Sequence, residues 1–426
     1  MNETLTAAPQ SGAQTETSHT SVAMPSTQPA ARLNFLDNLK MILVVLVVAH
    51  HAGQPYGPTG GSWPIMHAVK ERMLGPFFHT NASFFMGLFF FLGGYFTPDA
   101  FDRKGMGRFI ADRWTRLGIP LLIGVVLLVP LANWMRLTLS PGIVAFPFDM
   151  GYWHFFIRDF LGIGPMPELW PVRERWPQLN FGWLWFVEHL LIYAMLYAAW
   201  RAITPARVKD AVAPAPPTGR AIIGYAVALA AASFVIRIWF PINDWIAFLG
   251  FWQMEPAHWP QYASLFAIGL VAGRGRWIET MDRRRGLTWL AVGIGLSVFL
   301  YVMVGLGVIG DGAPSVASAG SGGVHLPDWK GCIWEAFTCT ALCVGLPVAF
   351  RELAWGAGRL WRMLARNVLA IYVFHFPIVL ALQWALTNTD LPKWSRLLLT
   401  WPVAVIVTVA FTNFVVLRIP GLRRVF

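Results

Sequence analysis

Two adjacent histidines close the first hydrophobic segment, LDNLKMILVVLVVAHHAG, which covers residues 36–53. The same segment holds Asp37 and Lys40 near its start. A charged group inside a spanning helix costs about 2.5–3.5 kcal/mol on insertion scales, so such residues are usually retained for a function. At about 100° per helical residue, Asp37, Lys40 and His51 share one polar stripe, while His50 is turned away by about 100°. A structural Asp37–Lys40 ion pair accounts for part of this stripe, but it leaves the histidines unexplained.

An imidazole in this position is suited to proton chemistry. Neutral imidazole is the natural base for removing a proton from a hydroxyl near pH 7, and it can also carry an acyl group transiently. The rise of about 1.5 Å per residue separates Lys40 from His51 by about 16 Å, which is half a bilayer. The stripe therefore predicts a polar path between the two membrane faces, with His51 as its reactive group.

Two arginines stand where the third hydrophobic segment begins, in RFIADRWTRLGIPLL. In a regular α-helix Arg113 and Arg116 lie one turn apart and face the same way. They are either ordinary anchors at the cytoplasmic edge or a fork of guanidiniums suited to the phosphates of a cytoplasmic donor.

Two further hydrophobic segments contain polar residues. Glu188 and His189 occur in WLWFVEHLLIY, either as a carboxylate that orients a histidine or as residues that reach out to the membrane surface. Tyr372 and His375 occur one turn apart in LARNVLAIYVFHFP. For His375 the alternatives are a hydrogen-bonded residue of the helix bundle and a residue that lines a substrate site.

The composition predicts the fold class. The chain has 426 residues, of which 56% are hydrophobic and only 13% are charged, whereas a soluble domain carries about 25% charged residues. We therefore predict an all-α polytopic membrane protein in which residues 32–420 form one domain of about ten transmembrane helices. The predicted helices cover residues 34–53, 80–97, 114–135, 183–200, 221–240, 261–273, 287–309, 332–350, 367–387 and 397–417.

Charge predicts the orientation of these helices. Most of the 33 Lys and Arg residues flank the helices on the side of the N-terminus, so both termini are expected to be cytoplasmic. The net charge of +11 is spread between the helices, which does not indicate a nucleic-acid partner. Residues 1–31 have the composition of a disordered cytoplasmic tail. The longest outer loop, about 137–182, contains tryptophans that either anchor at the membrane interface or stack on a sugar, namely Trp153, Trp170 and Trp176.

Five segments together resemble the acyltransferase-3 family of integral membrane acyltransferases, and they occur in the family's order. The family's first motif is a basic residue followed, after ten intervening residues, by a histidine. Lys40 and His51 match these two positions, although Arg is commoner than Lys at the first. The other segments are FFMGLFFFLGGYFTP, DRWTRLGIPLL, LWFVEHLLIYAMLY and LARNVLAIYVFHFPIV. Among the branches of this family, these segments most resemble the glucan-modifying, succinyl-transferring branch.

The resemblance implies transfer of an acetyl or succinyl group from a cytoplasmic acyl-CoA to a hydroxyl of an envelope glycan or a related acceptor. It implies a multi-pass protein of the inner (plasma) membrane, with acyl-CoA as a substrate and no permanently bound cofactor. The expected site residues are His51 as general base with Lys40, Asp37 and Glu188, then Arg113 and Arg116 on the CoA phosphates, and Tyr372 and His375 on the acceptor side.

Two other classes of function stay open on the sequence alone: a secondary transporter, and a proton-coupled or structural membrane partner with no chemistry of its own. A secondary transporter for a glycan or an organic anion also buries His, Lys and Asp in a helix bundle, but its usual signature of internal repeats with broken helices is not evident. We expect no metal site, because no cluster of His, Cys and carboxylate residues has ligand spacing on one short segment.

Overall fold

The computed structural model describes residues 33–58, 63–65, 70–139, 151–167, 176–204, 213–248, 252–310, 328–353 and 358–426. The predicted disordered tail, residues 1–31, and Trp170 of the outer loop lie outside these ranges. The structural statements below refer to the described residues.

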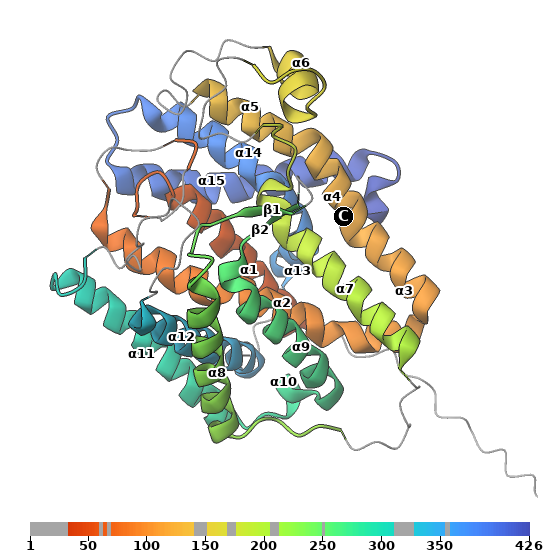
Figure 1. Cartoon of the computed structure of the whole chain (residues 1–426), viewed down its shortest axis with the longest axis vertical. Helices are drawn as coiled ribbons and strands as arrows, with labels where there is room; N and C mark the ends of the chain where they lie inside the picture. The colour runs from red at the N-terminus through yellow and green to blue at the C-terminus, as the bar shows by residue number, and fades with distance from the viewer. Residues whose placement is uncertain are drawn as a thin grey trace, which may run out of the picture. The chain divides into compact units, whose positions relative to one another are not determined.

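Helices dominate the described part of the chain (Figure 1). Nine of them are long and apolar enough to cross a membrane, which confirms the predicted class of polytopic all-α membrane protein. The remaining predicted segment, 261–273, is the sixth along the chain and forms the shorter helix α9 of 17 residues, with Pro260 in its first turn. The helices are α1 (Asn34–Gly53), α2 (Gly75–Lys104), α3 (Met106–Arg113), α4 (Ile119–Ile123), α5 (Val129–Leu139), α6 (Tyr152–His154), α7 (Trp185–Ile203), α8 (Gly219–Arg237), α9 (Trp259–Gly275), α10 (Trp277–Thr280), α11 (Arg283–Gly305), α12 (Trp329–Glu352), α13 (Arg359–Arg366), α14 (Val368–Thr387) and α15 (Lys393–Phe414).

One span departs from regular α-helix. The segment Met106–Thr138 is continuous, but π-helical turns at Trp114–Gly118 and Gly124–Leu128 separate α3, α4 and α5. A π turn has more residues per turn than an α-helix, so it rotates the side chains that follow it relative to those that precede it. This rotation affects the two arginines discussed below.

A two-stranded hairpin connects α8 to α9. Its strands β1 (Ile246–Phe248) and β2 (Trp252–Met254) pair antiparallel, with Ile246 opposite Met254. A 3-10 turn at Pro256–His258 then leads into α9. Non-helical backbone of this kind is tolerated in a membrane protein only where it is covered by protein or lies near water, because lipid cannot satisfy its polar groups.

The helix α2 lies at the centre of the bundle, and its contact with α9 is made by backbone. A methyl group at Gly94 would lie 2.1 Å from the carbonyl oxygen of Phe266, and one at Gly269 would lie 2.2 Å from that of Phe91. Only glycine permits this approach, and small residues are the usual means of packing helices in lipid, where apolar surface alone gives no preference between partners. In the most apolar stretch of each helix, 83% of the residues of α2 are buried, against 22% for α11, which is peripheral.

The helix α1 is held along its length by α14 and α15, which Figure 1 shows in blue beside it. The indole nitrogen of Trp401 in α15 donates to the carbonyl oxygen of Val45 at 3.2 Å. On the opposite side, the ring of His50 contacts Phe78 and Phe85 of α2, with ring centroids 4.9 and 5.3 Å apart. Since His50 faces α2, its neighbour His51 faces α14.

Candidate active site

His51 forms a pair with His375, which comes from a helix more than 300 residues later in the chain. The Nδ1 atom of His51 lies 2.8 Å from Nε2 of His375. The two rings are nearly parallel, with centroids 5.0 Å apart and an interplanar angle of 9°. His375 is fully buried, so the pair lies inside the protein and not on its surface.

The hydrogen bonds of His375 define which nitrogen of each neutral ring carries the proton. The Nδ1 atom of His375 lies 2.8 Å from the carbonyl oxygen of Tyr372 and 3.0 Å from that of Ile371. A carbonyl oxygen only accepts, so this Nδ1 carries the proton and Nε2 of the neutral ring accepts. His51 must then donate from its own Nδ1. The Nε2 atom of His51 is left with a lone pair, which is the state that a general base requires.

Pro377, two residues after His375, leaves a backbone acceptor in α14 that binds a residue just before α7. Pro377 has no N–H, so the carbonyl oxygen of Val373 loses its usual partner in α14. The indole nitrogen of Trp183 donates to this oxygen at 3.1 Å, and the hydroxyl of Tyr372 donates to the carbonyl oxygen of Trp183. The ring of Trp183 also stacks on Phe376 with centroids 4.3 Å apart. These contacts lock the turn of α14 that carries both Tyr372 and His375.

The other face of His51 is held by two residues that were not singled out in the sequence, Trp63 and Gln383. Gln383 donates from Nε2 to the carbonyl oxygens of His51 at 2.9 Å and Ala52 at 3.2 Å, which satisfies backbone acceptors at the end of α1. Its Oε1 accepts from the indole nitrogen of Trp63 at 2.8 Å. The ring of Trp63 stacks on His51, with centroids 5.3 Å apart. Gln383 could have been singled out from the sequence, because it is a polar residue in an otherwise apolar span and polar residues within a bilayer need partners.

Asp37 and Lys40 bind each other rather than the histidines. The Nζ atom of Lys40 lies 2.9 Å from Oδ1 of Asp37, one turn apart on α1. The ammonium group also lies 4.9 Å from the centre of the Phe96 ring of α2. The structure thus contains the ion pair that was the structural alternative for these two residues, and their catalytic role remains a prediction.

Glu188 and His189 are both buried, with exposed fractions of 4% and 5%, so neither reaches out to the membrane surface. The Nδ1 atom of His189 lies 2.8 Å from the carbonyl oxygen of Trp185 and 2.6 Å from Oε2 of Glu188. The contact with Glu188 is an ion-pair distance without hydrogen-bond geometry, and neither carboxylate oxygen has a hydrogen-bond partner in the described part of the chain. Buried polar atoms are nearly always hydrogen-bonded, so this carboxylate is a candidate for binding a ligand.

A π-helical turn starts at Trp114, between Arg113 and Arg116, so the spacing between them is not that of a regular α-helix. Arg116 is largely exposed and its Nε lies 3.1 Å from Oδ1 of Asp112. Arg113 lies over the ring of Phe109, and its Nε is buried without a hydrogen-bond partner among the described residues. The two arginines thus differ in burial and in partners, and their joint binding of CoA remains a prediction.

A buried group of charges supports the C-terminal end of α8 and the N-terminal ends of α9 and α12. Arg237 makes two hydrogen bonds to Glu335, at 2.7 and 2.9 Å. His258, in the turn before α9, lies 3.4 Å from Glu335 and 3.0 Å from Glu255. Burial by itself would lower the pKa of His258, but Glu255 and Glu335 outweigh it and raise this pKa to about 9.

The same charges hold the hairpin in place beside α7. Burial opposes ionisation of Glu255, but the neighbouring His258 together with the backbone N–H of Asn243 lowers the pKa of this carboxyl below its ordinary value. The hairpin that follows Asn243 brings the ring of Trp245 within 5.9 Å of Trp185, close to the buried Glu188. This group therefore positions the hairpin segment next to the candidate ligand-binding carboxylate.

The tryptophans of the outer loop differ from one another. Trp153 is 71% exposed, as an interface anchor or a sugar-stacking residue would be. The indole nitrogen of Trp176 is buried and has no hydrogen-bond partner in the described ranges. Both interpretations of this loop stay open.

Comparison with known proteins identifies the family. A family model described as an acyltransferase domain matches residues 33–417. Among curated proteins, glucans biosynthesis protein C from Salmonella paratyphi B and the protein of the same name from Salmonella heidelberg are each 33% identical over 103 residues. That alignment spans 24% of this chain and 26% of the relatives, so the chain matches only about a quarter of their length. The family model decides among the classes of function that the sequence left open: the chain belongs to the acyltransferase-3 family and is a membrane-bound O-acyltransferase.

Proposed function

We propose that this protein transfers an acetyl or succinyl group from acyl-CoA to a hydroxyl of an envelope glycan, with His51 as the general base. The observation that carries the proposal is the hydrogen bond between His51 and His375, which leaves the Nε2 atom of a neutral His51 free to accept a proton. The partial similarity to proteins named for glucan biosynthesis supports the choice of acceptor.

The reaction needs one base that also acts as an acid. Nε2 of His51 takes the proton of the acceptor hydroxyl while the hydroxyl oxygen attacks the thioester carbonyl carbon. The tetrahedral intermediate collapses with cleavage of the carbon–sulfur bond, and the CoA thiolate leaves with the proton that His51 held. The products are the ester and free CoA, and His51 returns to its neutral state.

We assign His375 and Tyr372 to positioning His51 rather than to direct contact with the acceptor. His375 fixes the tautomer of His51, and Tyr372 fixes the turn that carries His375 through its hydroxyl and carbonyl groups. A partner that holds a catalytic imidazole in one tautomer is a recurring element of nucleophilic and base catalysis. The acceptor side is assigned to Glu188, whose buried carboxylate has no hydrogen-bond partner among the described residues.

The donor is proposed to enter from the cytoplasmic side. Arg113 and Arg116 are near the start of a span whose first residues are on that side by the charge pattern. The Asp37–Lys40 pair lies near the same side of α1 and forms the inner end of the stripe that leads to His51. Since the donor is cytoplasmic and the acceptor lies in the envelope, the protein is assigned to the inner (plasma) membrane.

The proposal is tested by release of free CoA thiol from the purified protein in nanodiscs. Acetyl-CoA and succinyl-CoA are supplied with and without an envelope-glucan fraction, for the wild type, His51→Ala and His50→Asn. His50 is the matched control because it neighbours His51 but packs against Phe78 and Phe85. We expect acceptor-dependent release that His51→Ala lowers by at least about 100-fold and His50→Asn largely retains. Full release by His51→Ala, or absence of both release and CoA binding in the wild type, contradicts the proposal.

A further inference from the structure

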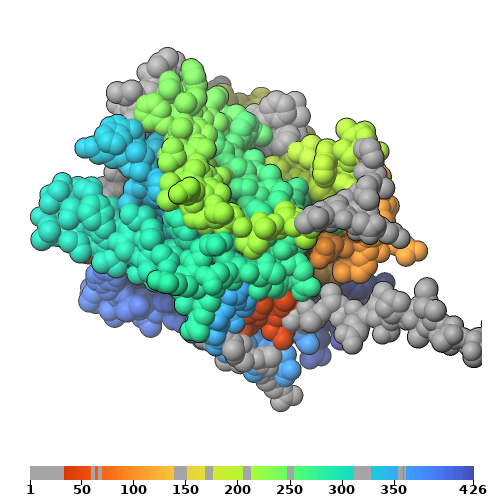
Figure 2. Space-filling model, turned by 90° about the horizontal axis from the view of Figure 1, so that it is seen from below, coloured from red at the N-terminus to blue at the C-terminus, as the bar shows by residue number. Residues whose placement is uncertain are grey.

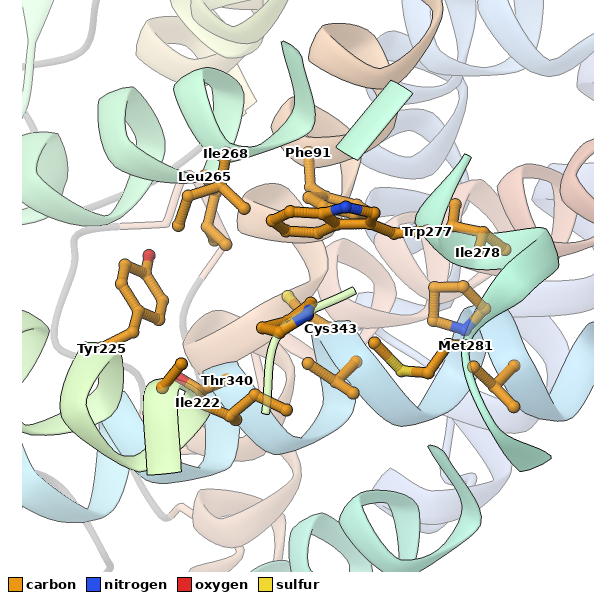
Figure 3. Close-up of a pocket in the computed structure, with 15 residues that line it drawn as sticks. Phe91, Ile222, Tyr225, Leu265, Ile268, Trp277, Ile278, Met281, Thr340 and Cys343 are labelled. Carbon is orange, nitrogen blue, oxygen red and sulfur yellow. The ribbon is translucent and has the colours of Figure 1, made fainter. Parts of the chain in front are cut away.

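A cavity of about 220 Å³ lies among α2, α8, α9, α10 and α12, apart from the two histidines (Figure 3). In Figure 3 Tyr225 lies at one end of this space and Met281 at the other, with Trp277 and Phe91 above Cys343. None of the residues that hold His51 lines it. An engineered apolar cavity of roughly 150 Å³ is enough to bind benzene, so this space accommodates several methylene groups.

The wall of the cavity provides no free polar group in the described residues. The hydroxyl of Tyr225 is hydrogen-bonded to Ser264 at 2.8 Å, and that of Thr340 donates to the carbonyl oxygen of Ala336 at 2.7 Å. The indole nitrogen of Trp277 donates to the carbonyl oxygen of Pro214 at 2.7 Å. A ligand with amide groups, such as the pantetheine arm of CoA, would leave them without partners, which is costly. An unbranched hydrocarbon chain meets no such penalty.

The cavity extends from the middle of the membrane helices to their cytoplasmic ends. Phe91 and Thr340 are central in α2 and α12, whereas Pro217 precedes α8 and Met281 precedes α11. By the charge pattern, α8 and α11 both begin on the cytoplasmic side. Figure 2, which views the molecule from the side where these helices begin, shows the residues around α8 beside the green and teal residues of α9 to α11.

One arginine contacts this end of the cavity, and two more are its neighbours or neighbours of lining residues in the sequence. Arg285 donates from Nη1 to the carbonyl oxygen of the lining residue Pro217 at 3.0 Å. Arg220 directly precedes the lining residue Ala221, and Arg284 directly precedes Arg285. Arg220 and Arg284 are exposed, and neither forms an ion pair within the described ranges. The N-terminus of α8 adds the positive end of a helix dipole at the same place.

We propose that this cavity binds one acyl chain of an anionic phospholipid of the cytoplasmic leaflet, with its phosphate near Arg220, Arg284 and Arg285. An apolar cavity together with arginines that form no ion pair within the described ranges matches a molecule with a hydrocarbon tail and a negative headgroup. The cytoplasmic leaflet is rich in such lipids, and basic residues at its surface attract them. The site does not depend on the acyl-transfer chemistry proposed above.

The test is photocrosslinking in nanodiscs with phosphatidylglycerol that carries a diazirine in the middle of one acyl chain. Crosslinked peptides are mapped by mass spectrometry, and unlabelled phosphatidylglycerol, phosphatidylcholine or palmitoyl-CoA is added as competitor. We expect labelling of α8, α10 and α12 at the lining residues, with phosphatidylglycerol competing at least about fivefold better than the other two. Better competition by palmitoyl-CoA would make the cavity part of a donor site, and equal competition by phosphatidylcholine would remove the anionic preference; either result overturns the proposal.

Matched variants separate the cavity from the outer surface of the bundle. Ala221→Phe adds a ring at a position that lines the cavity, whereas Ala228→Phe makes the same change two turns later on α8 at a position that does not line it; both alanines are exposed, so only the contact with the cavity differs. We expect Ala221→Phe to reduce labelling of the lining residues at least about fivefold and Ala228→Phe to leave it unchanged. Arg220→Gln combined with Arg284→Gln should abolish the preference for phosphatidylglycerol, unlike the same changes at the exposed Arg103 and Arg108. Labelling that none of these variants alters contradicts the proposal.

Discussion

The Nδ1 atom of His51 and the Nε2 atom of His375 lie 2.8 Å apart, across the contact between α1 and α14. The Nδ1–H group of His375 donates to carbonyl oxygens of its own helix, so the backbone defines which nitrogen of His375 carries the proton. Through the hydrogen bond between the two rings, this also defines the tautomer of His51. A base arranged in this way is ready before any substrate binds. The relationship leads directly to a prediction about His375.

Replacing His375 should lower turnover without weakening substrate binding. His375→Phe removes the acceptor for Nδ1–H of His51, so the imidazole loses its preferred tautomer and orientation. We expect kcat to fall by about 10–100-fold with KM for acyl-CoA within about twofold of the wild type. His375→Gln retains an acceptor oxygen and should recover part of kcat, a result that packing alone would not produce. An unchanged kcat in His375→Phe would exclude the positioning role.

Gln383 should matter both for stability and for turnover. Gln383→Leu removes the donor to the carbonyl oxygens of His51 and Ala52, and the buried acceptors left behind cost about 1–3 kcal/mol of unfolding free energy. The end of α1 then becomes less ordered, so kcat should fall as well. Thermal unfolding and thiol release measure the two effects. The control is Thr387→Val, which loses only a hydrogen bond within α14; an equal response of the two variants would speak against a specific role for Gln383.

Glu188→Gln should separate function from stability. The change keeps the shape of the side chain and removes a buried negative charge that has no hydrogen-bond partner in the described residues. We expect the unfolding temperature to stay at or above that of the wild type, because an unsatisfied buried charge is unfavourable, while turnover falls by about 10-fold or more. Glu71→Gln, at the partly exposed ion pair with Lys393, is the control and should alter turnover little. A marked loss of stability in Glu188→Gln would instead indicate a structural role.

The arginines at the start of the third span should affect donor binding. A charge-assisted hydrogen bond to phosphate is worth about 1.5–3 kcal/mol, so Arg113→Gln and Arg116→Gln should each raise KM for acyl-CoA about 10-fold or more with little change in kcat. Arg108→Gln, an exposed arginine on the same helix α3, is the matched control. If all three variants have the KM of the wild type, these arginines are ordinary membrane anchors.

The ion pairs of His258 predict loss of stability at alkaline pH. Its pKa is raised to about 9 from an ordinary 6.5, so its charged form contributes stability in full below about pH 6.5 and nothing once the pH has risen above about 9. We expect the unfolding temperature of the wild type to fall by roughly 5 °C or more between pH 6.5 and 9.5. His258→Gln should flatten this dependence, whereas replacement of the exposed His154 should not. A wild-type protein whose stability does not change over this range would contradict the assignment.

The sequence by itself determined the class of protein and the places where chemistry is possible. A long apolar run must become a helix in lipid, because the bilayer offers no partners for backbone polar groups, and so the ten predicted segments all correspond to helices. The same argument singled out His51, Glu188 and His375, since burying a polar side chain in lipid costs free energy and such residues are usually retained for a function. The sequence did not predict local deviations from regular helix, such as the π-helical turn that begins between Arg113 and Arg116.

Only the tertiary structure decided which polar groups meet. Helical periodicity states where a side chain lies around its own axis, but it does not state which helix will pack there. Periodicity placed Lys40 and His51 on one polar stripe, but Lys40 binds Asp37. The neighbours of His51 are instead His375, Trp63 and Gln383. In lipid, apolar surface does not distinguish one partner helix from another. The choice depends on close contacts such as Gly94 against Gly269 and on hydrogen bonds between residues hundreds of positions apart.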